Sequence, residues 1–317
     1  MNTPQTLYLL IPCYNEEEAL PLTAGILAER MSGFINEKLI SAQSKIVFID
    51  DGSKDKTWSI ISELHGKDNL FSGIRLSRNR GHQNALLAGL MTVKNMCDFT
   101  ISMDADLQDD IEVLKDFITK YYEGNEIVYG VRSSRKTDSF FKRWSAESFY
   151  KLMRAFGADI VYNHADYRLA SKKVLQALDG FQEVNLFLRG LFPLIGFKTT
   201  TVYYERKERT AGKTHYPLSK MIALALNGIT SLSVKPLRFI TTLGLFVFIV
   251  CFVLLLYVLI NHFTGGKTVD GWSSIIISIW GLGGLQLFSI GVIGEYVGKI
   301  YLETKHRPRF IIYEILN

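Results

Sequence analysis

The chain has 317 residues, of which 48% are hydrophobic and 21% charged, and its formal net charge is +5. This length accommodates one large domain and a further segment. Cys13, Cys97 and Cys251 have neither metal-site nor disulfide spacing, as expected in a reducing compartment. Basic residues lie among aromatic ones, but no nucleic-acid-binding motif is present. The composition therefore predicts a protein without a nucleic-acid partner.

Up to about residue 204, apolar runs typical of strands alternate with helical patterns. The expected strands are Leu7–Ile11, Ile46–Ile49, Phe71–Leu76, Phe99–Met103 and Ile127–Val131. The expected helices are Glu16–Met31, Thr57–Leu64, Gln83–Met96 and Ile111–Tyr122. Such alternation predicts an α/β domain whose mostly parallel sheet is covered by helices on both faces. No Gly-x-Gly-x-x-Gly motif follows a strand, which argues against a dinucleotide-binding Rossmann domain.

Three of the predicted strands end in polar residues, and ligands of open α/β sheets bind outside the carboxyl ends of strands. Carboxylates that lose water there require a cation or donor, and hard oxygen ligands suit Mg²⁺ or Mn²⁺. For an Asp-x-Asp pair taken alone, a solvated turn is the alternative. The residues at these three ends are Pro12, Tyr14 and Glu16, then Asp50 and Asp51, then Asp104, Asp106 and Gln108.

Together these segments resemble the nucleotide-sugar glycosyltransferases of family 2, whose type A fold is a Rossmann-like, mostly parallel sheet. The resemblance implies that Mg²⁺ or Mn²⁺ is held by Asp104, Asp106 and Gln108. It also implies a loop over the diphosphate at residues 206–216. The nucleotide-sugar-binding residues that it implies are Pro12, Tyr14, Glu16, Asp50, Asp51, Asp104, Arg209 and Lys213.

A basic segment begins at Arg132, which directly follows the strand predicted at Ile127–Val131 and should therefore point into the same crevice. It resembles the part of polyprenyl-phosphate sugar transferases that receives the acceptor phosphate. Arginine suits this task because its planar guanidinium binds phosphate oxygens in pairs. A solvated basic face is the alternative. The implied acceptor residues are Arg132, Arg135, Lys142 and Ser145.

The segment Asn163–Leu169 is similar to the Asp-aromatic-Arg-Leu motif of the family, which implies that Asp166 and Arg168 are catalytic together with Arg132. In relatives with hydroxyl acceptors the Asp is a general base. A phosphate acceptor has a second pKa of about 6 and is already largely ionised at neutral pH. We therefore expect Asp166 to orient sugar hydroxyls or to fix Arg168, and a structural Asp–Arg pair is the alternative. We interpret His82 as structural.

The C-terminal part changes in character. Residues 217–238 carry an apolar stripe typical of an interfacial amphipathic helix, and 239–260 and 273–294 contain no charge. Each stretch reaches the roughly 20 residues of a membrane span, so we expect a two-span transmembrane hairpin rather than a buried one. Flanking Lys and Arg residues, and the absence of a signal peptide, predict a cytoplasmic catalytic domain. The predicted divisions are 1–216, 217–238, 239–296 and a cytoplasmic tail at 297–317.

This layout resembles the bacterial polyprenyl-phosphate glycosyltransferases, which implies an inverting, metal-dependent transfer of a hexose to undecaprenyl phosphate by a multi-pass protein of the bacterial inner membrane. The resemblance favours UDP-glucose as the donor, with GDP-mannose as the alternative, while the sugar and base stay open. A processive polysaccharide synthase is a second alternative, although Trp144 lacks the Gln of its Gln-x-x-Arg-Trp motif. A non-enzymatic membrane scaffold is a third alternative. Such a scaffold would be expected to have lost the acidic residues of the metal site, which are present here. Whether the chain forms a homo-oligomer is left open.

Overall fold

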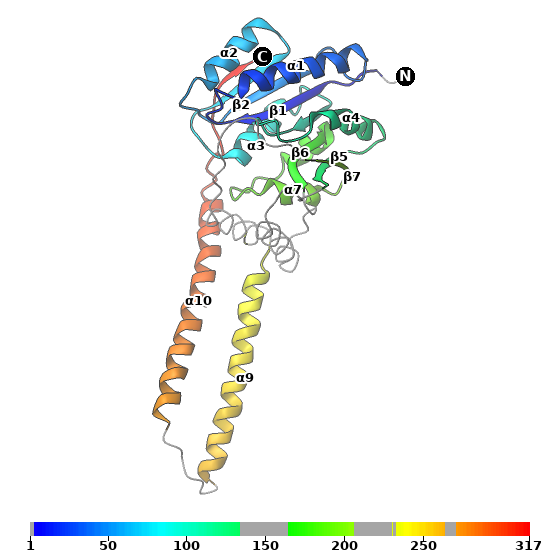
Figure 1. The fold of residues 1–317 in the computed structure, drawn as a ribbon. Coiled ribbons are helices and arrows are strands. Elements are labelled where there is room, and N and C mark those ends of the chain that lie inside the picture. Colours follow the sequence, from blue (N-terminus) through cyan, green and yellow to red (C-terminus); the bar gives the residue numbers. More distant parts are fainter. Residues whose placement is uncertain (1–2, 134–163, 206–229, 231–232, 264–270) are drawn as a thin grey trace.

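The computed structural model describes residues 3–133, 164–205, 230, 233–263 and 271–317. These residues form a domain with a central sheet, from which two long helices project (Figure 1). The strands are β1 Leu7–Cys13, β2 Lys45–Asp50, β3 Phe71–Leu76, β4 Phe99–Ser102, β5 Ile127–Arg132, β6 His164–Ser171, β7 Thr199–Tyr204 and β8 Ile312–Leu316. The helices are α1 Leu20–Asn36, α2 Thr57–Lys67, α3 His82–Val93, α4 Leu114–Tyr122, α6 Lys172–Leu178, α7 Leu188–Ile195, α9 Lys235–Phe263 and α10 Trp272–Thr304, with a short 3-10 turn at Ile111–Val113.

The sheet has the order β7-β5-β6-β4-β1-β2-β3-β8. Strands β4, β1, β2 and β3 pair in parallel, and so do β5 and β7. Strand β6 runs antiparallel between β4 and β5, and β8 runs antiparallel along β3. The α/β prediction and its five strands are confirmed, whereas β6, β7 and β8 were not predicted.

Helices cover both faces of the sheet, so the central strands are buried at nearly every position. On β1, Leu7, Leu9 and Ile11 pack with α1, α2 and α4 in one core cluster. The intervening Tyr8 and Leu10 pack with α3, α6 and α7 in the other. Because both faces are held, the ends of β1, β2 and β4 are fixed relative to one another.

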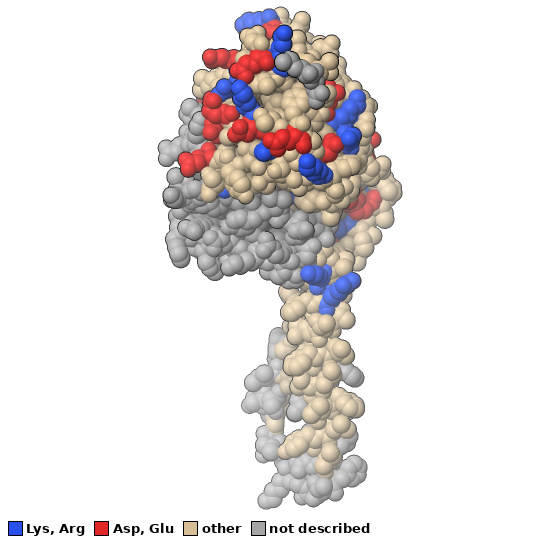
Figure 2. Space-filling view, turned by 90° about the vertical axis from the view of Figure 1, so that its right-hand side faces the viewer, with Lys and Arg blue, Asp and Glu red and all other residues tan. Residues whose placement is uncertain are grey.

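Helices α9 and α10 lie side by side and project away from the domain (Figure 1). Figure 2 shows acidic and basic side chains gathered over the domain, while the described surface of the helix pair is largely uncharged on this face. Large apolar side chains are exposed there, such as Phe246 at 64% and Leu287 at 72%.

One prediction about these helices is wrong. A membrane crossing requires one helix with about 20 consecutive apolar residues. Within the part of the chain that the structure describes, no helix combines the necessary length and apolar character. This finding overturns the predicted location as a multi-pass inner-membrane protein. Most of the predicted amphipathic segment 217–238 lies outside the described residues, and α9 begins at Lys235.

After α10 the chain returns to the domain. Strand β8 pairs with β3, with Ile315 opposite Ile74 and Glu314 opposite Arg75. The Glu314 carboxylate accepts a hydrogen bond from the Trp58 indole at 3.1 Å. The Arg75 guanidinium lies 5.5 Å from the centres of both the Trp58 and the Tyr313 rings. The segment predicted as a tail thus contributes a strand and side-chain contacts to the domain.

Candidate active site

The carboxyl ends of the parallel strands meet at one edge of the sheet. In the β1–β2 ladder Cys13 is opposite Asp50, and in the β1–β4 ladder Leu10 is opposite Ser102. The polar residues that follow these strands therefore begin at the same edge. Of the predicted donor-binding residues on β1 and after it, Pro12 is buried in the strand, Tyr14 is exposed and Glu16 is half-buried.

Asp50 closes the end of β2 and is completely buried. Its Oδ1 accepts a hydrogen bond from the Ser53 amide at 2.9 Å, and its Oδ2 lies 3.5 Å from Arg75 Nε. Since the Arg75 guanidinium also lies against Trp58 and Tyr313, Asp50 is linked to the C-terminal strand.

Asp51 binds the loop that follows β3. Its two carboxylate oxygens accept hydrogen bonds from the amides of Arg80 at 2.7 Å and Gly81 at 2.8 Å. Burial raises the pKa of Asp51, and the two amides partly offset this rise. Gly52 has φ 68°, and a Cβ there would lie 2.6 Å from the Arg78 carbonyl carbon, so only glycine allows this close approach. Asp51 thus positions the start of α3.

The predicted metal ligands lie in a tight turn after β4. Leu107 has φ 53°, which non-glycine residues adopt rarely and often at functional sites. In this turn the Gln108 amide donates a hydrogen bond to Asp106 Oδ1 at 3.2 Å. Burial and the neighbouring carboxylates Asp166 and Asp106 raise the pKa of Asp104, whereas His82 opposes the rise. Two carboxylates that repel each other in a half-buried turn favour a bound cation.

A cation held here would need further ligands. Among the residues that the structure describes, no three His, Cys, Asp or Glu side chains are grouped as a metal site. Two carboxylates and one amide nonetheless fit Mg²⁺ or Mn²⁺, because Mg²⁺ typically binds one or two carboxylates and takes its other ligands from substrate phosphates and water. The residues present therefore fit a metal that binds together with a phosphorylated substrate.

Strand β6 brings Asp166 to the same edge, because β6 runs antiparallel to β4. Ser102 at the end of β4 pairs in register with Arg168, and its hydroxyl donates to the Asp166 carbonyl at 2.6 Å. This antiparallel pairing places the Asp166 side chain beside that of Asp104. The two residues are more than sixty positions apart in the sequence and belong to different predicted motifs.

The carboxylate of Asp166 is surrounded by nitrogen donors. Arg189 on α7 donates through Nε to Oδ1 at 3.1 Å and through Nη2 to Oδ2 at 2.9 Å. Arg168 Nη2 lies 3.4 Å from Oδ1. The His82 Nε2 atom lies 3.6 Å from both Asp166 Oδ2 and Asp104 Oδ1. Burial raises the pKa of Asp166, but Arg189, His82 and Arg168 outweigh it and leave the pKa well below its usual range. Asp166 is therefore held as an ion.

Arg168 is buried, and its guanidinium lies 3.9 Å from the centre of the Phe192 ring. Within the described residues its Nε and Nη1 atoms have no hydrogen-bond partner. Burial lowers the pKa of Arg168 to about 10. Arg168 thus contacts Asp166 and Phe192 in the interior of the domain.

Arg132, the last residue of β5, belongs to a second group. Its Nε donates to the Tyr204 hydroxyl oxygen at 3.4 Å, and its Nη2 lies 3.8 Å from Asp109 Oδ1. The Tyr204 hydroxyl donates to the same Asp109 oxygen at 2.6 Å. Burial is the main cause that raises the pKa of Asp109 to about 6, and Asp104 adds to it. Burial lowers the pKa of Arg132, but Tyr204, Asp109 and, to a smaller extent, Asp104 outweigh it and raise the pKa, so the two groups interact.

Several predicted site residues lie outside the described residues. These are Arg135, Lys142 and Ser145 of the acceptor set, Arg209 and Lys213 of the diphosphate loop, and Trp144. Four residues that the structure brings to the site were not assigned to it from the sequence, namely His82, Asp109, Arg189 and Tyr204. Asp109 was detectable, because it belongs to the acidic run after β4. Arg189 had no local signal, since only the packing of α7 brings it to Asp166.

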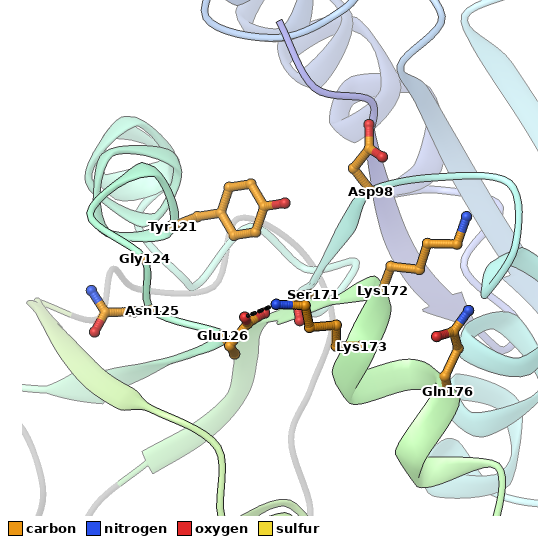
Figure 3. Close-up of a pocket in the computed structure, with 9 residues that line it drawn as sticks. All are labelled: Asp98, Tyr121, Gly124, Asn125, Glu126, Ser171, Lys172, Lys173 and Gln176. Atoms are coloured by element: carbon orange, nitrogen blue, oxygen red, sulfur yellow. Dashed lines mark hydrogen bonds and ion pairs between the residues drawn. The ribbon is translucent and has the colours of Figure 1, made fainter. Parts of the chain in front are cut away.

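A cavity of about 410 Å³ lies at the opposite edge of the sheet (Figure 3). It is bordered by Asp98, which precedes β4, and by Ser171, which ends β6. Lys173 there donates to Glu126 at 2.9 Å, so an ion pair of opposite charges borders the cavity. The cavity therefore does not share the chemistry of the carboxyl edge.

Comparison with known proteins agrees with this geometry. The profile of glycosyl transferase family 2 matches residues 8–179. The chain is 54% identical over 306 residues to "Uncharacterized glycosyltransferase YkoT" of Bacillus subtilis (strain 168), covering 96% of this chain and 90% of that protein. It is 42% identical over 305 residues to "Bactoprenol glucosyl transferase" of Shigella phage SfV, covering 96% and 97%.

Solved structures are more distant. A Mycobacterium tuberculosis glucosyl-3-phosphoglycerate synthase, solved with Mn²⁺, UDP-glucose and phosphoglyceric acid, matches with a TM-score of 0.43 and 14% identity. The match covers 72% of this chain and 78% of that one. Similarity at this level supports no functional comparison.

Proposed function

The chain belongs to glycosyl transferase family 2 and is a glycosyltransferase, and from this premise we propose that it transfers a hexose from a nucleotide sugar to a polyprenyl phosphate. One observation carries the proposal. The acidic turn with Asp104 and Asp106 lies directly beside the cationic group around Asp166, with His82 Nε2 at 3.6 Å from a carboxylate on either side. A cation-binding half and an anion-stabilising half thus share one edge of the sheet.

Donor binding is assigned to the acidic half. Asp104, Asp106 and Gln108 would hold Mg²⁺ or Mn²⁺, which when bound supplies a Lewis acid that neutralises the diphosphate. Pro12, Tyr14 and Glu16 lie at the neighbouring strand end and would contact the nucleoside. Asp50, which accepts a hydrogen bond from Ser53 and lies near Arg75, and Asp51, which accepts one from Arg80, would support this nucleoside-binding end of the sheet.

Arg132 is assigned to the acceptor phosphate. Its side chain is 23% exposed, it is fixed by Tyr204 and Asp109, and it interacts electrostatically with Asp104. A guanidinium so held can bind phosphate oxygens without losing much side-chain freedom. Arg135, Lys142 and Ser145 would complete this site.

The reaction is proposed to be a single displacement. An acceptor phosphate oxygen forms a bond to the anomeric carbon, the bond from that carbon to the diphosphate breaks, and the nucleoside diphosphate leaves with the electron pair. Attack opposite the leaving group inverts the configuration. Since the second pKa of a phosphate ester is about 6, no base has to remove a proton at neutral pH. Asp166, whose two carboxylate oxygens accept hydrogen bonds from Arg189, would orient the sugar or the guanidinium groups.

The test uses the purified full chain with undecaprenyl phosphate in detergent and a panel of radiolabelled nucleotide sugars. We expect transfer from UDP-glucose to the lipid, loss of transfer in EDTA, and recovery with Mg²⁺ or Mn²⁺. GDP-mannose, UDP-galactose and UDP-N-acetylglucosamine are the competing donors. Nuclear magnetic resonance of the product should show a β-linkage from an α-linked donor. Absence of lipid product with every donor would refute the proposal.

A further inference from the structure

The C-terminal end of α10 contacts the loop that leads into α7. Glu303 Oε2 accepts a hydrogen bond from the Val184 amide at 2.9 Å. Its Oε1 accepts one from the Asn185 amide at 2.9 Å and one from Asn185 Nδ2 at 2.7 Å. Burial raises the pKa of Glu303, but these donors outweigh it and leave the pKa below its usual value. Both oxygens of the ionised Glu303 carboxylate thus accept hydrogen bonds from the same loop.

The same loop is fixed at its beginning and at its end. Arg309, which follows α10, donates through Nη1 to the Phe181 carbonyl at 2.9 Å. Gln83 Oε1 on α3 accepts a hydrogen bond from the Leu188 amide at 3.0 Å. The residue after Leu188 is Arg189, so the loop ends where the paired contact with Asp166 begins.

The first turn of helix α7 is held by the core packing of Leu188 and Leu191, by Gln83 and by the loop that precedes it. Its N-cap residue Phe187 provides no side-chain hydrogen bond, and the helix has only eight residues. The depth at which Arg189 enters the site therefore depends in part on the loop before it. A displacement of about 1 Å in a catalytic group can cost about 100-fold in rate, so such support matters for turnover.

We propose that Glu303 is a positioning residue for Arg189, and that the end of α10 thereby sets the geometry of the Asp166–Arg189 pair. The inference rests on the proposed function only for its kinetic readout. Glu303 lies beyond the family match at 8–179 and does not touch the reacting groups. It acts by holding Val184 and Asn185, and through them the start of α7.

The kinetic test compares Glu303→Gln with the wild type in the full chain. Glutamine keeps one acceptor oxygen but places an NH₂ group against an amide donor, so part of the loop contact is lost. We expect kcat to fall about 10-fold with the KM for the nucleotide sugar unchanged. Glu63→Gln is the matched control, because Glu63 is an exposed helical glutamate that pairs with Lys67 at 2.6 Å. It should have wild-type kinetics.

A double-mutant cycle with Arg189→Lys tests whether the effect passes through Arg189. If it does, Glu303→Gln should change kcat by less than about 2-fold in the Arg189→Lys background, since coupled residues are non-additive. Multiplication of the two losses would overturn the proposal, because it would mean that Glu303 acts independently. An unchanged kcat for Glu303→Gln alone would overturn it as well.

A second readout does not need turnover. The Nε–H resonance of Arg189, assigned by its loss in Arg189→Lys, reports the contact with Asp166 directly. We expect this resonance to shift and to exchange faster in Glu303→Gln, and to stay unchanged in Glu63→Gln. If the wild type makes no lipid product but the resonance responds, the proposed function fails and the positioning role stands. If the enzyme is active and the resonance does not respond, the positioning role fails.

Discussion

Asp104, in the turn after β4, and Asp166, on the neighbouring strand β6, both lie 3.6 Å from the same His82 nitrogen, yet their pKa values shift in opposite directions. Both are desolvated. Asp104 has carboxylates beside it, whereas Asp166 has the guanidinium groups of Arg189 and Arg168. The difference teaches that neighbours, rather than burial or residue type, decide the role of each acid. Asp104 is suited to attract a cation, and Asp166 to anchor cations that are already present.

The largest expected effect comes from removing a carboxylate from the acidic turn that contains Asp104 and Asp106. Asp106→Asn removes one of two carboxylates and should lower kcat by about 1,000-fold or more, because charge stabilisation at the leaving diphosphate is lost. Circular dichroism and the thermal midpoint should match the wild type. Full activity of this variant in EDTA would show that the acidic turn does not hold a metal.

Removing a cationic side chain from beside Asp166 should have the next largest effect. Arg189→Ala removes both short contacts to Asp166 and should lower kcat by about 100-fold. Arg189→Lys keeps the charge but not the paired geometry, so it should recover only part of this loss. Steady-state kinetics of both variants provide the measurement. Equal activity of the lysine variant and the wild type would mean that only the charge matters.

A smaller effect is expected when Asp166 itself loses its charge. Asp166→Asn keeps one acceptor oxygen, and we expect a rate loss of about 10-fold that changes little between pH 7 and 9. A general base would contribute about 100- to 10,000-fold, and hydroxide could replace it at high pH. A large loss that shrinks steeply as the pH rises would therefore contradict the anchoring role.

The smallest expected effect concerns stability at Asp109. Its folded-state pKa of about 6 lies above the unfolded value of about 4, so the folded protein binds more protons between these pH values. The free energy of unfolding contributed by this group therefore falls as the pH rises through that window, by roughly 1–3 kcal/mol. Asp109→Asn should remove this slope in urea unfolding at pH 5, 6 and 7. An identical slope in the variant would mean that a group other than Asp109 titrates in this pH range.

The sequence predicted the parallel half of the molecule because its signal is local. Strands β1 to β5 are largely buried on both faces, and Asp51 follows β2 directly while Asp104 follows β4 after Met103. Strand β6 was not predicted, because its buried Asp166 and Arg168 interrupt the apolar run. Nor could the opposite electrostatic states of Asp104 and Asp166 be predicted. They depend on Arg189 and on the antiparallel pairing of β4 with β6, which the sequence does not display.

The pairing of β8 with β3 has a consequence for synthesis of the chain. Strand β3 ends at Leu76, and its partner begins at Ile312. At roughly 5–20 residues per second, the ribosome needs on the order of 10 to 50 s to add the residues between them. During that time β3 presents unpaired backbone groups, which are a template for association with other chains. The nascent domain therefore has an open sheet edge until α9 and α10 have been made, and a chaperone that shields strand edges would act in this interval.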